Sequence, residues 1–440
     1  MNSESTLHQE VQVLHGARVA LEAEQSSHVA IEIAAGRITG IQNESSFAAG
    51  KTPASHIDLS GLLVMPGLIN AHDHLEFSLF PRLANPPYPN YIEWGTDIHK
   101  TFPGLIARHR AVPKDLRLWW GGIRNLLCGV TTVSHHNPLW ADLQRADFPL
   151  RVVQDYGWGH SLALGGDLIA ARSATPAGFP FIIHIGEGID PIAKAELSRL
   201  DRLGLLNSDT VLVHGLAIDS DGVALIERKQ ASLIICPSSN SFLFERLPDI
   251  KTLGGVTKIA LGNDSPLTAQ GDLLDEIRFS ISKCGISPQT AYRMVTRAPA
   301  SILRLSHAEG TLNLHGAADL FAIRDSGHDV VHRLSSLSLR EVELVMIAGR
   351  VQLVSEAFLD RIPSAEKQGL EPLWVDGTVR WLRAPVEQLL RETEAVLGKD
   401  NVSLGSRQIR CRSSMEQCAD TQDPETQLAL TDHAEQWGTR

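Results

Sequence analysis

Two hydrophobic patterns divide the chain. Near its start, the runs VQVLHGARVAL and HVAIEIAAGRITGIQ are β-branched, alternate with polar positions and break at glycine, as short strands do. The same strand-like pattern returns much later in GAADLFAIRDSG and EVELVMIAGRVQLVS. We therefore predict that both ends of the chain build one small β-sandwich domain around a central insert.

The central insert alternates short apolar strands with helical stretches from about Met65 to Leu305. This alternation is typical of parallel βα units and predicts an α/β fold, most simply a (β/α)8 barrel. The expected strands are Leu62–Ala71, Val130–His136, Leu150–Tyr156, Phe181–Ile185, Val211–His214, Ser232–Cys236 and Lys258–Gly262. The expected helices are Pro113–Cys128, Pro191–Leu203, Ser220–Lys229, Asp272–Lys283 and Pro288–Arg297.

One barrel unit is expected to be short. The strand pattern is visible seven times, not eight, and the stretch between Tyr156 and Phe181 is too short for two complete units. We expect HSLALGG, at His160–Gly166, to supply the remaining strand.

These patterns also set domain boundaries. Residues 1–64 and 308–370 form the β domain, 65–307 the barrel, 371–398 a helical segment that includes PVEQLLRETEAVLG, and 399–440 a tail. The tail is polar without periodicity, so we expect it to be disordered. Its Cys411 and Cys418 have no partners at zinc-finger spacing, and we expect no metal site there.

Polar side chains end several of the barrel strands. His72 and His74 are two residues apart and would point the same way on a strand, His184 and His214 end two later strands, and Asp264 ends the last. The carboxyl ends of barrel strands meet at one rim, so these side chains should converge there. Three imidazoles and a carboxylate suit Zn²⁺, Fe²⁺ or Mn²⁺.

Glu187 lies three residues beyond His184, in HIGEG, and would sit in the loop just past the proposed ligands. A carboxylate at that place could accept a proton from a metal-bound water and pass it to a leaving group. The alternative is a solvated loop acid with no role.

Composition narrows the class of protein. The chain has 440 residues, of which 43% are hydrophobic, and a net charge of −11. That charge disfavours nucleic acid and anionic membranes as partners. The N-terminal MNSESTLHQE lacks the features of a signal peptide, and five scattered cysteines do not form a disulfide framework, so we expect a cytoplasmic protein without a membrane span.

Five motifs in order, MPGLINAHDH, HIGE, VHG, CPSSN and LGNDS, resemble the amidohydrolase superfamily. The resemblance runs from about residue 10 to residue 360, includes GTLNLHGAADL, and is closest to the mononuclear branch of cytosine, guanine and S-adenosylhomocysteine deaminases and the triazine hydrolases. It implies that His72, His74 and His184 bind one metal, with Asp264 as ligand and base. His214 would hold the water or the substrate, and Glu187 would shuttle the proton.

The resemblance also bears on the number of metals. Two-metal members bridge their ions with a carboxylated lysine on a middle strand. Between Asn137 and Ile183 this chain has no Lys, Glu or Cys. We therefore expect one divalent ion, Zn first and Fe as the alternative.

The expected activity is hydrolysis of a non-peptide C–N bond, deaminating a small heterocycle or an amidine by a metal-activated hydroxide. Amide, urea or halide hydrolysis on the same scaffold is the second enzyme interpretation. A catalytically inactive scaffold homologue is the interpretation outside enzymes. The partner would be a small molecule, and homo-oligomerisation is left open.

Several further residues are candidates for substrate contact or support. His135, His136, Trp158 and His160 follow or lie on strands near the rim and are candidates for substrate binding. Asp73 should point away from the metal and make a structural hydrogen bond. Ser238, Ser239, Asn240 and Glu76 are candidates for shaping the pocket. Ser265 and Asp272 are candidates for bracing Asp264, or Asp272 caps the helix that follows. Cys236 is expected to be a buried apolar filler.

Overall fold

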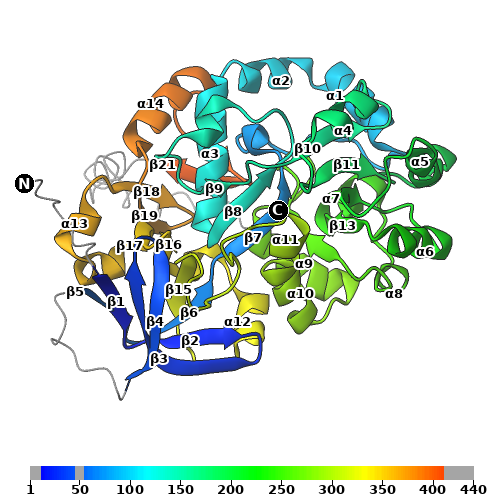
Figure 1. Cartoon of the computed structure of the whole chain (residues 1–440). Coiled ribbons are helices and arrows are strands. Elements are labelled where there is room, and N and C mark those ends of the chain that lie inside the picture. Colours follow the sequence, from blue (N-terminus) through cyan, green and yellow to red (C-terminus); the bar gives the residue numbers. More distant parts are fainter. Residues whose placement is uncertain (1–10, 45–53, 411–440) are drawn as a thin grey trace, which may run out of the picture.

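A ring of short parallel strands forms the centre of the molecule, with helices around it (Figure 1). The computed structural model describes residues 11–44 and 54–410. The ring consists of a three-stranded arc and a five-stranded arc. The arcs contain β7 (Leu68–Asp73), β8 (Val130–His135) and β9 (Arg151–Val152), and then β10 (Gly157–Ser161), β11 (Phe181–Ile185), β12 (Thr210–His214), β13 (Ser232–Ile235) and β14 (Ile259–Leu261).

The ring closes where β14 meets β7. Asp73 and Asp264 form an isolated parallel bridge, and the backbone N–H of Asp264 donates to the carbonyl of His72 at 3.0 Å. Gly262 permits this approach, because a Cβ there would lie 2.6 Å from the Cβ of His72. The closure places the first and last predicted site residues side by side.

The short barrel unit lies between the two arcs. After β9 the chain passes through residues 153–156 directly into β10, with no helix between them. The predicted extra strand at 160–166 is displaced: β10 begins at Gly157 and ends at Ser161, and α4 (Leu168–Ala174) follows. The predicted single strand Leu62–Ala71 is also divided, into β6 (Leu62–Pro66) and β7, with a break at Gly67.

The helices outside the ring begin where local signals place them. Asp190 caps α5 (Pro191–Arg202), Asp219 caps α6 (Ser220–Lys229) and Ser287 caps α10 (Pro288–Met294), each by accepting a backbone N–H bond. Proline follows the cap in α5 and α10. The predicted helix Pro288–Arg297 ends earlier, at Met294, and a further helix begins at Arg297. The helices are α3 (Lys114–Leu127), α5 (Pro191–Arg202), α6 (Ser220–Lys229), α7 (Pro237–Phe244), α8 (Ile250–Leu253), α9 (Leu273–Cys284), α10 (Pro288–Met294) and α11 (Arg297–Ile302).

Two helices that the sequence did not predict lie between β7 and α3. They are α1 (Tyr91–Thr101) and α2 (Pro103–Arg110), and they follow the 3-10 helix η2 (Leu75–Phe77). Asn90 caps α1 by accepting from the N–H groups of Ile92 and Glu93.

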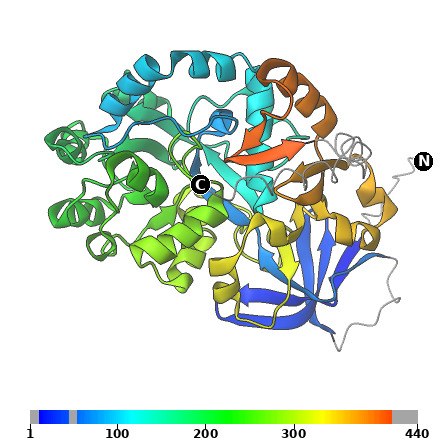
Figure 2. The same cartoon turned by 180° about the vertical axis from the view of Figure 1, so that it is seen from behind.

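Both ends of the chain contribute to a mainly antiparallel β domain beside the barrel (Figures 1 and 2). The N-terminal strand β6 pairs antiparallel with β15, which comes after the barrel. The strands are β1 (Val11–His15), β2 (Arg18–Glu22), β3 (Gln25–Ala34), β4 (Arg37–Asn43), β5 (Ala54–Asp58), β6, β15 (Leu320–Arg324), β16 (Val342–Ile347) and β17 (Arg350–Ser355). Short helices join the later strands: α12 (Val330–Ser336), η4 (Leu339–Glu341), η5 (Glu356–Arg361) and α13 (Ser364–Lys367).

Two predictions for the end of the described chain were wrong. The segment 371–398 is not only helical, because β18 (Glu371–Val375) and β19 (Thr378–Leu382) precede α14 (Val386–Leu397). Residues 399–410 are not disordered, because β20 (Ser403–Leu404) and β21 (Arg407–Arg410) form a hairpin that pairs with β18. The rest of the predicted tail, with Cys411 and Cys418, lies outside the described residues.

The barrel is filled by apolar side chains that alternate along its strands. Ile69, Ile182, Val211 and Ile234 pack inside the ring, and Ile302 from α11 joins them. Within residues 11–44 and 54–410, no helix is both long and apolar enough to cross a membrane.

Candidate metal centre and active site

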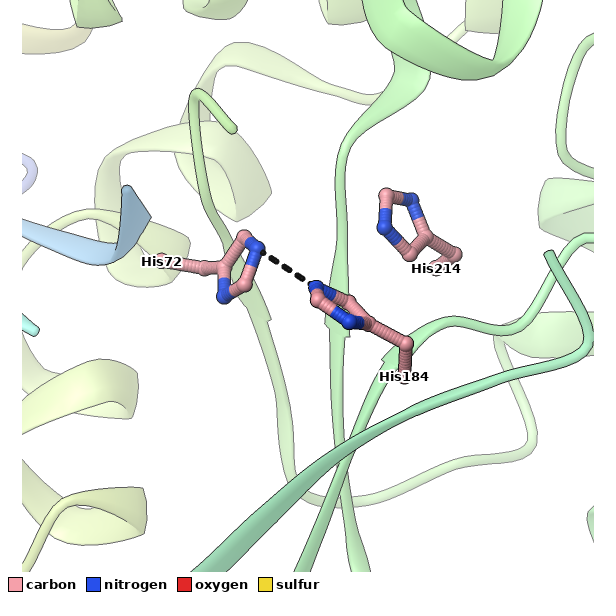
Figure 3. A group of neighbouring side chains, drawn as sticks. All are labelled: His72, His184 and His214. Atoms are coloured by element: carbon pink, nitrogen blue, oxygen red, sulfur yellow. Dashed lines mark hydrogen bonds between the residues drawn. The ribbon is translucent and has the colours of Figure 1, made fainter. Parts of the chain in front are cut away.

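Five of the predicted site residues meet at the carboxyl ends of the strands. His72 is on β7 and His74 follows it, His184 is on β11, His214 ends β12 and Asp264 follows β14; all five are buried. Ligand atoms of His72, His184 and His214 lie within 4.8 Å of one another, as do those of His72, His74 and Asp264. Figure 3 shows the first three rings, with Nε2 of His72 and His184 3.2 Å apart. His72 belongs to both groups and links them.

The backbone is strained at two of these positions. His214 has φ of +75° and Asp264 has φ of +56°, a left-handed conformation that side chains other than glycine rarely adopt. Such strain costs on the order of 1–3 kcal/mol and persists where the surrounding structure imposes it. Here it occurs at the ends of two barrel strands, where it sets the direction of each functional side chain.

Hydrogen bonds fix the tautomers of two imidazoles. Nδ1 of His184 lies 2.7 Å from the carbonyl oxygen of His160, and Nδ1 of His214 lies 3.1 Å from Oδ1 of Asn240. Because those oxygens only accept, Nδ1 carries the hydrogen in each ring. Nε2 of each ring therefore presents a lone pair to the cluster.

Asp264 is held by two hydroxyls. Ser239 and Thr268 donate to its Oδ2 at 2.7 and 2.8 Å. This leaves Oδ1 facing the imidazoles, 3.6 Å from Nε2 of His74 and 3.9 Å from Nε2 of His72. The CPSSN motif pointed to Ser239 in the sequence. Thr268 was missed because it lies in a loop, four residues after Asp264, where no motif marks it.

Burial keeps the imidazoles neutral. It lowers the pKa of His72 and His184 well below the usual value and that of His74 and His214 to about 4. Neutral imidazoles beside a carboxylate are the donor set that Zn²⁺ and similar ions prefer. The residues present therefore fit a divalent metal.

Glu187 lies two residues after β11 and is buried. Its Oε2 is 3.5 Å from Nε2 of His214. Burial, and then the negative charge of Asp264, raise the pKa of Glu187 well above its usual value. This buried carboxyl group therefore binds a proton more readily than the solvated loop acid of the alternative interpretation would.

Asp73 points away from the cluster, as the strand alternation predicts. Both of its oxygens accept from Arg124 Nη2, at 2.7 and 2.6 Å, and Asn125 and Asn70 donate to it as well. Arg124 also donates to Oδ1 of Asn263, beside Asp264 in the chain. This buried network ties β7 to β14 from behind the site.

Asn137 supports His74 from a position that the sequence did not single out. Its Nδ2 lies 3.3 Å from Nδ1 of His74 and donates to Oε1 of Glu76 at 2.7 Å. Glu76 is buried, and its Oε2 is 3.6 Å from Nε2 of His135. His135 is thus placed behind His74 rather than in the cavity.

The other three candidates for substrate contact lie at different depths. His160 lines the cavity, and its ring centroid is 4.9 Å from that of His184. His136 is buried against the cluster, with its ring 4.2 Å from that of His184, and Trp158 packs 5.5 Å from His136.

The remaining residues predicted from the sequence cap a helix, fill the core or line the cavity. Asp272 caps α9 with a capping box and does not touch Asp264. Ser238 bonds Glu276, and Ser265 lines the cavity. Cys236 is a buried filler.

One cavity of about 300 Å³ opens onto the cluster. His74, His184, His214, Glu187 and Asp264 line it. Side chains from α1 and α2, which the sequence did not predict, complete its lining.

A search of family models matches residues 177–352 to the amidohydrolase family. A 5-methylthioadenosine/S-adenosylhomocysteine deaminase of Haloquadratum walsbyi is 25% identical, over 69% of this chain and 81% of that protein. Both comparisons fit the amidohydrolase superfamily. The corresponding deaminase of Saccharophagus degradans is 27% identical over 67% of this chain and 78% of its own.

Solved structures agree with this amidohydrolase fold. A zinc-bound adenosine deaminase from Xanthomonas campestris superposes with a TM-score of 0.69 at 19% identity, covering 88% of this chain and 97% of that one. Atrazine chlorohydrolase from Arthrobacter aurescens, complexed with zinc, gives a TM-score of 0.66 at 16% identity, covering 88% and 99%. These likenesses concern the fold alone.

Proposed function

We propose that this amidohydrolase uses one divalent metal to hydrolyse a C–N bond that is not a peptide bond, deaminating a small heterocycle or an amidine. The observation that carries the proposal is the cavity in which buried imidazoles, Asp264 and the buried carboxyl group of Glu187 come together. A hydrolase needs a water activator, a base and an acid within one small volume, and this cavity contains residues suited to each role.

In this proposal His72, His74, His184 and Asp264 hold the ion, with Zn the first expectation and Fe the alternative. When bound, the ion would act as a Lewis acid that makes water a nucleophile near neutral pH. Oδ1 of Asp264 faces the imidazoles while its other oxygen is bonded to Ser239 and Thr268, so its direction is fixed.

The chain's own groups would move the protons. Asp264, or His214 through the lone pair on Nε2, accepts a proton from the attacking water. Burial and the charge of Asp264 raise the pKa of Glu187, and its Oε2 lies 3.5 Å from Nε2 of His214, so in this proposal Glu187 delivers a proton to the departing amine. Ammonia then leaves, and the ring carbon keeps the oxygen.

The relatives support deamination, since the curated sequences in the comparison act, by their names, as deaminases of 5-methylthioadenosine and S-adenosylhomocysteine. The structural neighbours include a chlorohydrolase, so halide release on the same scaffold is the second candidate. We further propose a cytoplasmic protein whose partner is a small molecule; homo-oligomerisation stays open.

The first test is a metal count. We would purify the full chain without a histidine tag and measure its metals by inductively coupled plasma mass spectrometry, with His72→Ala and an exposed control, His332→Ala, beside it. About one Zn or Fe per chain, lost in His72→Ala and kept in His332→Ala, is expected because His72 belongs to both ligand groups.

The same preparation is then screened for ammonia release from purines, pyrimidines, triazines and amidines. About two metals per chain would contradict the single-ion proposal. No metal after reconstitution would favour an inactive scaffold homologue.

A further inference from the structure

The cavity has an apolar side that the proposed chemistry does not use. Its lining includes one cluster of packed side chains, here called the apolar wall: Phe77, Phe80, Leu83, Trp94, Ile98, Ile106 and Leu267. The wall draws on η2, the segment after it, α1, α2 and the loop after β14. It therefore depends on helices α1 and α2, inserted between β7 and α3.

The apolar wall begins directly beside the imidazoles. The ring of Phe77 lies 6.0 Å from that of His74, and Phe80 meets Phe77 edge to face at 5.6 Å. A molecule whose reacting carbon lies near Glu187 and Asp264 therefore extends along this wall.

Two polar groups of α1 that line the cavity already have partners within the protein. The indole N–H of Trp94 donates to the carbonyl of Leu83 at 2.8 Å, and the hydroxyl of Tyr91 bonds buried Glu196 at 3.2 Å. The other polar lining residues of α1 and α2, His99 and Arg110, are exposed. Hydroxyl groups placed against the wall would lose their hydrogen bonds to water without replacement.

The size of the cavity also exceeds one ring. A volume of about 300 Å³ corresponds to roughly ten water molecules at liquid density. A six-membered heterocycle in reaction position leaves part of that space, along the apolar wall, to be filled by something else.

We propose that the substrate is a heterocycle with an apolar aryl or short alkyl substituent, which lies on the apolar wall, and not a nucleoside with its sugar there. The inference rests on the proposed function, because it takes the reacting ring to lie at Glu187 and Asp264. It departs from the nucleoside substrates in the names of the curated relatives.

The test compares one ring with three substituents. 2,4-Diamino-1,3,5-triazine carries two amino leaving groups, and its 6-methyl and 6-phenyl derivatives differ only in apolar area. 5′-Methylthioadenosine represents the nucleosides. Each compound is added to the full chain with its metal, and both ammonia release and binding by titration calorimetry are measured.

We expect binding to strengthen about fourfold from hydrogen to methyl and about 10- to 100-fold from hydrogen to phenyl, from the apolar area removed from water. The phenyl compound should also bind more tightly than the nucleoside. Ile106→Ser should reduce the phenyl-to-hydrogen ratio at least fivefold. Its neighbour on α2, Leu105, does not line the cavity, so Leu105→Ser is the matched control and should leave the ratio unchanged. Phe77→Leu, a milder change in the wall, replaces Ile106→Ser if that variant does not fold.

The two readouts separate this inference from the proposed function. Ammonia release without any effect of the substituent, or a preference for the nucleoside, would overturn the apolar wall as a substrate site and leave the deaminase proposal standing. Binding that strengthens with the substituent, without ammonia from any compound, would support the wall and contradict deamination. An equal loss of the ratio in Ile106→Ser and Leu105→Ser would also overturn the inference.

Discussion

At the scale of single residues, the directions of two side chains in the site are fixed both by the backbone conformation and by hydrogen bonds. His214 and Asp264 have left-handed backbones, and each side chain is also bonded, to Asn240 in one case and to Ser239 and Thr268 in the other. Positions that end an apolar strand with a histidine or aspartate are visible in a sequence. Their supports, such as Thr268 and Asn137, are not, because a lone threonine or asparagine in a loop has no pattern around it.

Glu187→Gln tests the proposed proton donor. Glutamine keeps the shape of the side chain but has no acidic proton, so kcat with the substrate found in the ammonia screen should fall about 100- to 10,000-fold. The metal content should stay as in the wild type. Glu227→Gln, at a half-buried glutamate that accepts from Thr257 and does not line the cavity, is the control and should leave kcat unchanged. A fall of less than tenfold in Glu187→Gln would remove the residue from the mechanism.

Glu276 gives a prediction for stability and pH. Burial raises the pKa of Glu276 to about 8, although Ser238 donates to it from its backbone N–H and its hydroxyl. In the unfolded chain Glu276 releases its proton near the ordinary glutamate pKa, whereas in the folded protein it keeps the proton to higher pH. The contribution of Glu276 to the unfolding free energy is therefore fully present below about pH 4.5 and is lost as the pH rises toward 8. Between pH 5 and 8 the wild type should lose up to about 1.4 kcal/mol of unfolding free energy per pH unit relative to Glu276→Gln.

The measurement is urea unfolding of both proteins at several pH values in that range. Parallel curves for the two proteins would show that Glu276 is ionised in the folded state.

At the scale of elements, strands that end in site residues were the easiest to predict. Buried parallel strands are continuous apolar runs, and β11, β12 and β13 are found within one residue of their predicted bounds. β10 was misplaced because glycines 157 and 159 interrupt its apolar pattern. β18 to β21 are short or half exposed, so their sequences carry a weak period, and contacts distant in the chain decide their structure.

The network around Arg124 on α3 supports two strands at once. Arg124 bonds Asp73 of β7, Asn263 beyond β14 and the carbonyl of Gly271. Arg124→Met would leave Asp73 charged and buried without its partner, which costs about 3–5 kcal/mol. Chemical denaturation should show this loss, and metal retention on dialysis should weaken with it.

Arg145→Met is the control, because Arg145 pairs with Asp147 on the surface, where solvent screens such pairs and they contribute little to stability. Equal stability of the Arg124→Met and Arg145→Met variants would contradict the structural role of the network.

At the scale of the whole molecule, the end of the described chain returns to the barrel. Arg407 of β21 pairs with Asp272 at 2.8 Å and with Asp275, at the start of α9. Gly405 lies against the backbone of Gly271, whose carbonyl accepts from Arg124. The hairpin β20–β21 thus braces the loop that runs from Asp264 to α9.

Arg407→Met tests this brace. Two buried or half-buried carboxylates would lose their partner, so the unfolding free energy should fall by about 2–4 kcal/mol. Differential scanning calorimetry would show a lower Tm. Arg391→Met, at an exposed position of α14, should leave the Tm within about 1 °C. A Tm unchanged in both variants would mean that the hairpin does not contribute to stability.

The closure of the ring between β7 and β14 has a consequence for synthesis of the protein. A growing chain exposes His72 and His74 early, but their neighbour Asp264 emerges only after every other barrel strand, and β15, the partner of β6, emerges later still. Until then the nascent polypeptide holds an open row of strands with an incomplete ligand set. The complete set of proposed ligands therefore forms only when the barrel closes into a ring.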